Sequence, residues 1–295
     1  MTQSAIILGC GFTGKALARL LRERGYRVRG TTRDPAKARA LEDLGIEPLI
    51  LDTARPATLS GFSGEGAVVF DMIPPRNLKA APGPEVFKDD TRAVIRACAS
   101  ARLHKFVYLG STAIYGKTDA AWVDEETPIS PATPRARARQ AAEQAILEAQ
   151  RGGEFPGVIV RAPGIYGPGR TLADRIRRGG YRVPGDGRNF VNRIHVDDLA
   201  RILLAASERG RPGTVYLAAD DCPERARVVA DFCASLLGLP PPPSIDPDEA
   251  ARRMGESNFA MTWGDKRLRN RRIKEELGVV LRYPSYREGI PASLA

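Results

Sequence analysis

Cysteine and histidine are scarce in this sequence. Among 295 residues there are four cysteines and two histidines, and no two cysteines form a CxxC pair. Scattered thiols with so few histidines build neither a disulfide framework nor a zinc site. We therefore expect reduced cysteines and no bound metal. The residues concerned are Cys10, Cys98, Cys222, Cys233, His104 and His195.

Long apolar stretches are also missing. Nowhere do about 18 apolar residues follow one another, which is the length that a membrane-spanning helix requires. Residues 1–14 carry no basic leader. These absences predict a soluble, cytoplasmic protein without a membrane partner, and the 43% of hydrophobic residues suffices for a large core.

Lysine supplies few of the positive charges. The net charge is +10, from 45 Lys and Arg against 35 Asp and Glu, yet only eight of the cations are lysines. The arginines alternate with acids and alanines, as in residues 18–25, and form no basic block with aromatic residues of the kind a nucleic-acid surface needs. The charge therefore predicts a solvated, arginine-rich surface and no nucleic-acid partner.

Strand and helix patterns alternate along the first 165 residues. Short apolar runs indicate strands, and the stretches between them place apolar residues on one helical face. Such alternation predicts an α/β fold with a doubly wound parallel sheet of the Rossmann type. The predicted strands are 4–11, 26–33, 47–52, 66–75, 105–111 and 157–163, and the predicted helices are 13–25, 34–45, 86–104 and 134–153.

Beyond residue 165 the pattern loosens. Residues 1–165 form the predicted dinucleotide-binding domain, and a segment of about 194–218 is expected to complete its sheet. The remaining residues, 166–193 and 219–295, are expected to form a smaller C-terminal substrate lobe. Here we predict helices at 196–207, 246–257 and 264–278, a strand at 214–220, and an irregular tail at 283–290.

Three glycines, Gly9, Gly11 and Gly14, follow the first predicted strand with the spacing GxGxxG. A lone GxGxxG is a weak signal, but this one directly follows a strand and opens a helix. Gly9 permits a tight turn, Gly11 lets the backbone approach a pyrophosphate, and Gly14 allows the helix to pack closely on the strand. The free N–H groups at the positive end of the helix would hold the phosphates of NAD(P).

The end of the second strand bears on the choice between NAD and NADP. An acidic residue about 20 positions after the glycines normally binds the ribose hydroxyls of NAD. Thr32 and Arg33 stand there instead and suit a 2′-phosphate, so NADP is predicted; NAD is the alternative, with Arg33 an ordinary surface residue. Asp52, after the third strand, is placed to meet the adenine. The predicted cofactor-binding set also contains Phe12, Thr13, Thr53, Ile73, Pro74, Gly110, Pro163 and Ile165.

Three segments carry a family resemblance. GSTAIYG (110–116), RAPGIYGPGR (161–170) and RIHVDDLA (193–200) resemble the extended short-chain dehydrogenase/reductases, the NAD-dependent epimerase/dehydratase family. With the glycine spacing and the segments 264–270 and 281–289, the sequence is similar to the atypical branch of that superfamily. The resemblance covers most of the chain and implies the fold more specifically than any reaction. Relatives often pair through helices, so the resemblance leaves a homodimer open.

The chemistry of that family uses a tyrosine and a lysine four residues later, in the helix after the fifth strand. The tyrosine passes a proton, while the lysine lowers the tyrosine's pKa and holds the nicotinamide ribose. Arg135 and Arg139 occupy these places here, and no tyrosine occurs between Tyr115 and Tyr166. The usual dyad is therefore absent.

Three residues remain as catalytic candidates. Ser111 matches the family's Ser or Thr that orients the substrate oxygen. Arginine cannot shuttle a proton near neutral pH, but Arg139 can keep the role of binding the ribose. An ion pair with Glu143 within the helix is the competing interpretation for Arg135 and Arg139. Tyr115 is the candidate acid, or else it only packs against the substrate.

Arginines also mark the predicted substrate lobe. Arg170, Arg188 and Arg193 are candidates for binding an anionic substrate, although each can equally be a surface or interlobe contact. The arginine that grips a diphosphate in relatives acting on nucleotide sugars is displaced here, which disfavours such substrates. Asp197 or Asp198 should cap a helix that begins at Leu199.

These features predict an NADP-dependent oxidoreductase or epimerase-like enzyme that moves hydride between the nicotinamide and a small, anionic carbonyl or hydroxyl substrate. The alternative is a non-catalytic NAD(P)-binding sensor or scaffold, which the missing tyrosine and lysine would explain directly.

Overall fold

The computed structural model describes residues 3–59, 62, 64–78, 85–99, 101–153 and 155–295. At its centre lies a seven-stranded sheet in the order β3-β2-β1-β4-β7-β9-β14, with every neighbouring pair parallel. This order is that of a doubly wound Rossmann-type sheet, so the predicted fold class is confirmed. The strands are β1 (Ser4–Leu8), β2 (Arg27–Thr32), β3 (Glu47–Ile50), β4 (Ala67–Asp71), β7 (Lys105–Ser111), β9 (Gly157–Ala162) and β14 (Val215–Leu217).

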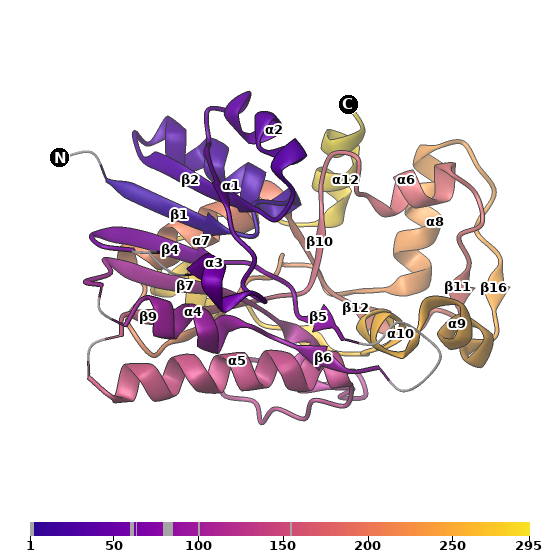
Figure 1. Ribbon diagram of the computed structural model, residues 1–295. Coiled ribbons are helices and arrows are strands. Elements are labelled where there is room, and N and C mark those ends of the chain that lie inside the picture. The colour runs from indigo at the N-terminus through magenta and orange to yellow at the C-terminus, as the bar shows by residue number, and fades with distance from the viewer. Residues whose placement is uncertain (1–2, 60–61, 63, 79–84, 100, 154) are drawn as a thin grey trace.

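Helices cover both faces of this sheet (Figure 1). In β1, Ala5 and Ile7 pack into the apolar core beneath α1 and α7, whereas Ile6 and Leu8 pack into the core beneath α4 and α5. Because both faces are buried, the strands are continuous apolar runs rather than alternating ones. The four covering helices are α1 (Phe12–Glu23), α4 (Thr91–Ala97), α5 (Pro134–Arg151) and α7 (Val196–Arg209).

Short elements make up most of the rest of the chain. None of the helices in the described ranges has the length and hydropathy of a membrane span. The helices are α2 (Arg39–Glu42), α3 (Pro56–Leu59), α6 (Leu172–Arg177), α8 (Ala226–Leu236), α9 (Pro247–Met254), α10 (Glu256–Thr262), α11 (Arg271–Glu275) and α12 (Tyr286–Leu294), with 3-10 turns at Pro35–Lys37 and Thr112–Tyr115. The paired strands are β5 (Arg76–Asn77) with β6 (Phe87–Lys88), β8 (Trp122–Val123) with β17 (Arg267–Leu268), β10 (Gly164–Tyr166) with β13 (Arg193–His195), β11 (Val183–Pro184) with β16 (Ser244–Ile245), and β12 (Phe190–Val191) with β15 (Glu224–Arg225).

Several predicted elements differ from those observed. The helix predicted at 34–45 is a 3-10 turn followed by the single turn α2, and the helix predicted at 86–104 shortens to α4. Helix α4 starts late because the Asp89 carboxylate accepts a hydrogen bond from Thr91 N, while the preceding residues pair as β6. The tail predicted to be irregular is the helix α12, which begins with a capping box between Ser285 and Glu288.

Helix α7 holds the C-terminal segment of the chain. Its cap is His195, whose Nδ1 accepts from Asp197 N at 3.1 Å, so the helix begins at Val196 and the expected cap by Asp197 or Asp198 is wrong. The fully buried Asp198 carboxylate instead accepts from Arg282 N and from Tyr283 N, each at 2.8 Å. Two charge-assisted hydrogen bonds thus tie residues 282–283 to the core helix.

Replacing Asp198 with alanine should destabilise the protein by about 3 kcal/mol, because two backbone N–H groups lose a charged, buried acceptor. Asp197→Ala is the matched control, since Asp197 pairs with a largely exposed Arg19, and should cost about 1 kcal/mol or less. Urea unfolding of both variants measures the difference. Equal losses would show that Asp198 does not anchor the C-terminal segment.

Candidate functional site

The predicted cofactor residues lie at one edge of the central sheet. Because all the strands are parallel, their carboxyl ends meet at the same edge, and in open α/β sheets ligands bind there. Six strands contribute: β1 leads to Gly9, β2 to Arg33, β3 to Asp52, β4 to Ile73, β7 to Ser111 and β9 to Pro163. The predicted cofactor residues, which are far apart in the sequence, therefore lie on loops that neighbour one another along this edge of the sheet.

The glycine turn between β1 and α1 has the geometry of a phosphate cradle. Gly9 adopts φ +81° and its N–H donates to Thr31 Oγ1 at 2.8 Å. A Cβ on Gly14 would lie 3.1 Å from Gly9 O, which explains the close packing of helix on strand. Gly11 faces open space, and no side chain caps the helix that it precedes. The first N–H groups of α1 therefore remain available to an anion, so these residues fit a dinucleotide.

Thr32 and Arg33 at the end of β2 differ in their surroundings. The Thr32 hydroxyl is engaged locally, 3.2 Å from both the N and the O of Asp34. Arg33 is exposed, and its guanidinium makes no hydrogen bond or ion pair to the described residues. After β3, the Asp52 carboxylate accepts from Ala54 N, and the buried Thr53 hydroxyl lies 3.3 Å from Asp90 Oδ2. Arg33 is thus free to meet a ligand, whereas Thr53 faces inward.

Two buried carboxylic acids lie under the loop that follows β4. The Thr91 hydroxyl is 2.7 Å from Asp71 Oδ2 and 2.6 Å from Asp89 Oδ1. The single hydroxyl hydrogen of Thr91 can be donated to only one of these oxygens at a time. Burial, together with the charge of Asp89, raises the pKa of Asp71 to about 7.

Arg139, which we expected in the position of the family's lysine, is held by three hydrogen bonds from one of its nitrogens. Its Nη1 donates to Tyr108 OH at 2.8 Å, to Ile73 O at 3.2 Å and to Asp89 Oδ2 at 3.3 Å. The competing interpretation, an ion pair between Arg139 and Glu143, is wrong, because Arg139 pairs with Asp89 and Glu143 pairs with Arg161. The Arg139 Nε and Nη2 groups have no acceptor among the described residues.

Arg135, in the position of the family's tyrosine, makes no pair with Glu143 either. Its Nη1 donates to Asn258 Oδ1 at 3.3 Å, and its guanidinium lies 5.6 Å from the Phe87 ring centroid. Burial lowers the Arg135 pKa, and the neighbouring charge of Arg139 adds to this effect. The side chain therefore joins α5 to α10 and supplies positive charge without an anionic partner of its own.

A second buried cluster surrounds Tyr115. Arg161 of β9 forms an ion pair with Glu143 of α5 at 2.8 Å and donates to Tyr115 OH at 2.5 Å. Gly110 makes room for this pair, because a Cβ there would lie 2.8 Å from Glu143 Oε1. Burial raises the pKa of Tyr115 to about 12, so its proton is held tightly at neutral pH. This setting favours a packing role for Tyr115.

Ser111 ends β7 and caps the 3-10 turn that leads to Tyr115. Its Oγ accepts from Ala113 N at 3.2 Å, while its own hydroxyl hydrogen has no acceptor among the described residues. Ser111 is half-buried and can therefore donate to the oxygen of a ligand.

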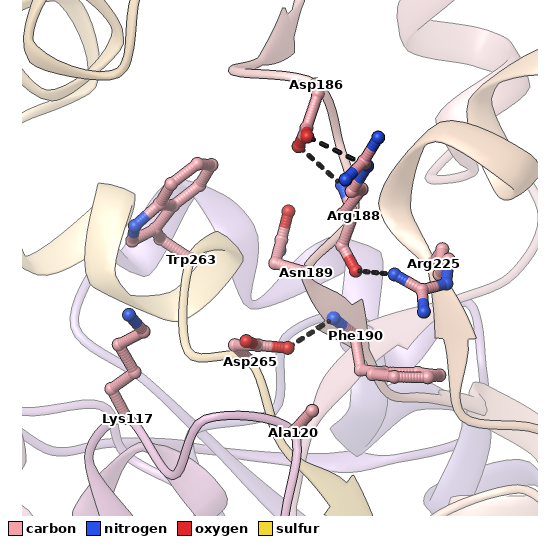
Figure 2. A pocket seen from close by; sticks show the side chains of 9 residues that line it. All are labelled: Lys117, Ala120, Asp186, Arg188, Asn189, Phe190, Arg225, Trp263 and Asp265. Atoms are coloured by element: carbon pink, nitrogen blue, oxygen red, sulfur yellow. Dashed lines mark hydrogen bonds and ion pairs between the residues drawn. The ribbon is translucent and has the colours of Figure 1, made fainter.

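The three arginines predicted to bind substrate do not lie together. Arg188 lines a cavity of about 280 Å³, drawn in Figure 2, and pairs there with Asp186 at 3.1 Å. Arg170 stacks over Phe12 at 5.2 Å, beside the glycine turn, and Arg193 lies over Tyr286 at 5.9 Å. Beside Arg188, the cavity is lined by Lys117, Ala120, Asp186, Asn189, Phe190, Arg225, Trp263 and Asp265.

The sequence analysis missed Asp89 and Tyr108. Both lie far from Arg139 in the chain, and both accept a hydrogen bond from its Nη1. The available signals were a tyrosine in the middle of an otherwise apolar strand and the acidic pair before α4. In the parts of the chain that the structure describes, no cluster of three possible metal ligands occurs.

A glycine turn with free N–H groups at the carboxyl edge of a doubly wound sheet defines a dinucleotide-binding protein. Residues 5–219 match the model of the NAD dependent epimerase/dehydratase family. The chain belongs to this family and is an NAD(P)-binding protein of the oxidoreductase and epimerase type.

Two characterised relatives are similar over most of their length. A ketoreductase of Stigmatella aurantiaca, named for 4-hydroxy-2-methyl-3-oxo-4-farnesyl-3,4-dihydroquinoline-1-oxide, is 28% identical over 84% of this chain and 78% of its own. The 3-diazoavenalumate denitrifying reductase of a Streptomyces species is 26% identical over 95% of this chain and 96% of its own.

Solved structures agree with the fold. A conserved protein of unknown function from Silicibacter pomeroyi has a TM-score of 0.84 and 35% identity, covering 99% of this chain and 98% of its own. The dTDP-glucose 4,6-dehydratase DesIV of Streptomyces venezuelae, crystallised with NAD, has a TM-score of 0.80 at 17% identity, covering 99% and 96%. The likeness to DesIV concerns the fold alone.

Asp71→Asn should change how stability depends on pH. The folded pKa of Asp71, about 7, lies above the value of about 3.9 for an unfolded chain, so folding takes up a proton between these limits. The wild type therefore loses this stabilisation as pH rises from about 4 to 7, whereas an amide does not titrate. Urea unfolding at pH 5 and pH 8 should show the variant gaining stability relative to the wild type at pH 8. A constant difference would contradict the assignment.

Proposed function

We propose that this protein is an NADP-dependent oxidoreductase acting on a small, anionic carbonyl or hydroxyl compound. The observation that carries the proposal is the glycine turn, where uncapped N–H groups of α1 face open space at Gly11. An anion with the geometry of a pyrophosphate suits this place. The bound nicotinamide would supply or accept a hydride.

Three residues of the chain would bind the ribose, the substrate oxygen and the 2′-phosphate. Arg139 is anchored through Nη1 and leaves Nε and Nη2 for the ribose, as the family's lysine would. Ser111 donates its hydroxyl hydrogen to the substrate oxygen and so orients the carbonyl. Arg33 meets the 2′-phosphate of NADP, because it is exposed, unpaired within the described residues and forked for phosphate.

Reduction is favoured over epimerisation by the two characterised relatives, a ketoreductase and a reductase. The cavity of Figure 2 supports a polar substrate, because Lys117, Arg188 and Arg225 line it with the aromatic Trp263. The absence of the tyrosine and lysine dyad supports a second candidate, a dinucleotide sensor without turnover. Binding alone requires the glycine turn but no proton donor.

Calorimetry with NADPH tests the site, and Gly11→Asp is the informative variant. A carboxylate at Gly11 should raise the Kd by about 100-fold or more, because like charges brought together cost several kcal/mol. The fold should persist, since the space around Gly11 is open. An unchanged Kd at an unchanged Tm would remove the glycine turn from the binding site.

Turnover separates the two candidates. Nicotinamide absorbance is followed while keto acids, ketones and aldehydes are added to the NADPH complex. Oxidation of NADPH by a carbonyl compound supports the enzyme, and tight binding with no oxidation across the panel supports the sensor.

Arg33→Asp should reverse the preference between cofactors. The variant loses a charged hydrogen bond to the 2′-phosphate and gains an acceptor for ribose hydroxyls, so the ratio of NADPH to NADH affinity should fall by about 100-fold. The measurement is the Kd of both nucleotides for the wild type and the variant. A wild type that prefers NADH would contradict the assignment of NADP.

A further inference from the structure

Five side chains form a surface row in which arginines and aromatic rings alternate. We call this set the arginine row, and its order is Arg269, Trp122, Arg267, Phe190 and Arg225. Each guanidinium lies over the ring beside it, 5.0 to 5.5 Å from the ring centroid. The residues come from separate parts of the sequence, so the fold alone assembles this surface.

Two small pairs of strands hold the row in place. In the pair of β8 with β17, Trp122 lies opposite Arg267, and in the pair of β12 with β15, Phe190 lies opposite Arg225. Arg267 joins the two pairs, because its guanidinium lies over both rings, and its Nε also donates to Ala120 O at 2.7 Å. The cations are therefore positioned before a ligand binds, which lowers the entropic cost of binding.

The positive charges of the row are not neutralised within the part of the chain that the structure describes. None of the three guanidiniums forms an ion pair with a described carboxylate. Acids close to the row have other partners: Asp265 Oδ1 and Glu224 Oε1 each accept from a backbone N–H at 2.8 Å, and Glu126 pairs with Arg272 at 2.6 Å. The row thus presents three positive charges to the outside, and charge complementarity requires an anionic partner.

The composition of the row favours a protein as this partner. Tryptophan and arginine are enriched among the residues that dominate the binding energy of protein interfaces, whereas lysine and glutamate are depleted. The row contains arginine, tryptophan and phenylalanine only, and Trp122 is 46% exposed. A single-stranded nucleic acid stacks its bases on free ring faces, but each ring here already contacts two guanidiniums. A second copy of this chain would carry the same net charge of +10 and be repelled.

We propose that the arginine row is the docking surface for an acidic segment of a partner protein. Carboxylates of that segment would accept paired hydrogen bonds from the N–H groups at the edges of the guanidiniums, because the rings contact only the guanidinium faces. Phe190 and Arg225 also line the cavity of Figure 2, so the docked segment would lie beside that cavity. This inference does not depend on the proposed oxidoreductase function.

The first test is binding of a fluorescein-labelled decaglutamate peptide to the full chain at about 50 mM salt, where screening is weak, read by fluorescence anisotropy. Decathymidylate has a similar charge and represents a nucleic acid, and decaglutamine is the neutral control. Decaglutamate should bind with a Kd below about 1 mM, and decaglutamine should not. A weaker Kd for decaglutamate, or tighter binding of decathymidylate than of decaglutamate, would overturn the proposal.

Two double variants with the same net charge locate the binding surface. Arg225→Glu with Arg269→Glu should raise the Kd of decaglutamate by about tenfold or more, because like charges replace the cations that contact it. Arg24→Glu with Arg96→Glu is the matched control, since both arginines are exposed at helix ends outside the row, and should raise the Kd by about twofold or less. Equal effects of the two doubles would show attraction to the net charge alone and contradict the proposal. If the first double does not fold, the exposed Arg269→Gln replaces it and should raise the Kd by about threefold.

Tryptophan emission checks the contact directly. The chain has two tryptophans, so Trp263→Phe leaves Trp122 as the only one. Its emission should change as decaglutamate saturates the protein, and constant emission would place the peptide elsewhere. Sedimentation of the protein alone tests the remaining occupant: self-association that is lost in the double variant of Arg225 and Arg269 would identify a second copy of the chain and overturn the acidic partner.

Discussion

The guanidiniums of Arg139 and Arg161 are paired with the carboxylates of Asp89 and Glu143, and these two pairs organise the centre of the protein. Arg135 and Arg139, which we expected in the places of the family's tyrosine and lysine, both lie in α5, and the Arg139 side chain is 12% exposed. Arg139 donates hydrogen bonds to Asp89, in the loop between β6 and α4, and to Tyr108 OH of β7. Helix α5 is thereby joined to the sheet by a polar network.

A second buried ion pair determines the surroundings of Ser111. Arg161 pairs with Glu143 and also donates to the Tyr115 hydroxyl, whereas the hydroxyl hydrogen of Ser111 has no acceptor among the described residues. The side chains at this edge of the sheet can therefore polarise a ligand oxygen by a hydrogen bond and bind an anionic group. Proton transfer by a phenol is disfavoured by burial.

Local signals explain what the sequence predicted well. The apolar strands and the glycine turn depend on neighbours within a few residues, and their positions were predicted correctly. The partners of Arg139 lie 31 and 50 residues away, so no local pattern announces them. The helix α12 was missed although Ser285 and Glu288 have capping-box spacing, because its interior contains a proline at Pro291.

The close approach of Gly110 to Glu143 has a consequence for substitutions at three positions. A side chain larger than hydrogen at Gly110 would displace the carboxylate, and loss of either Glu143 or Arg161 would leave the other charge buried alone. The three positions therefore form one unit: a change at any one of them destabilises the protein unless the other two change with it.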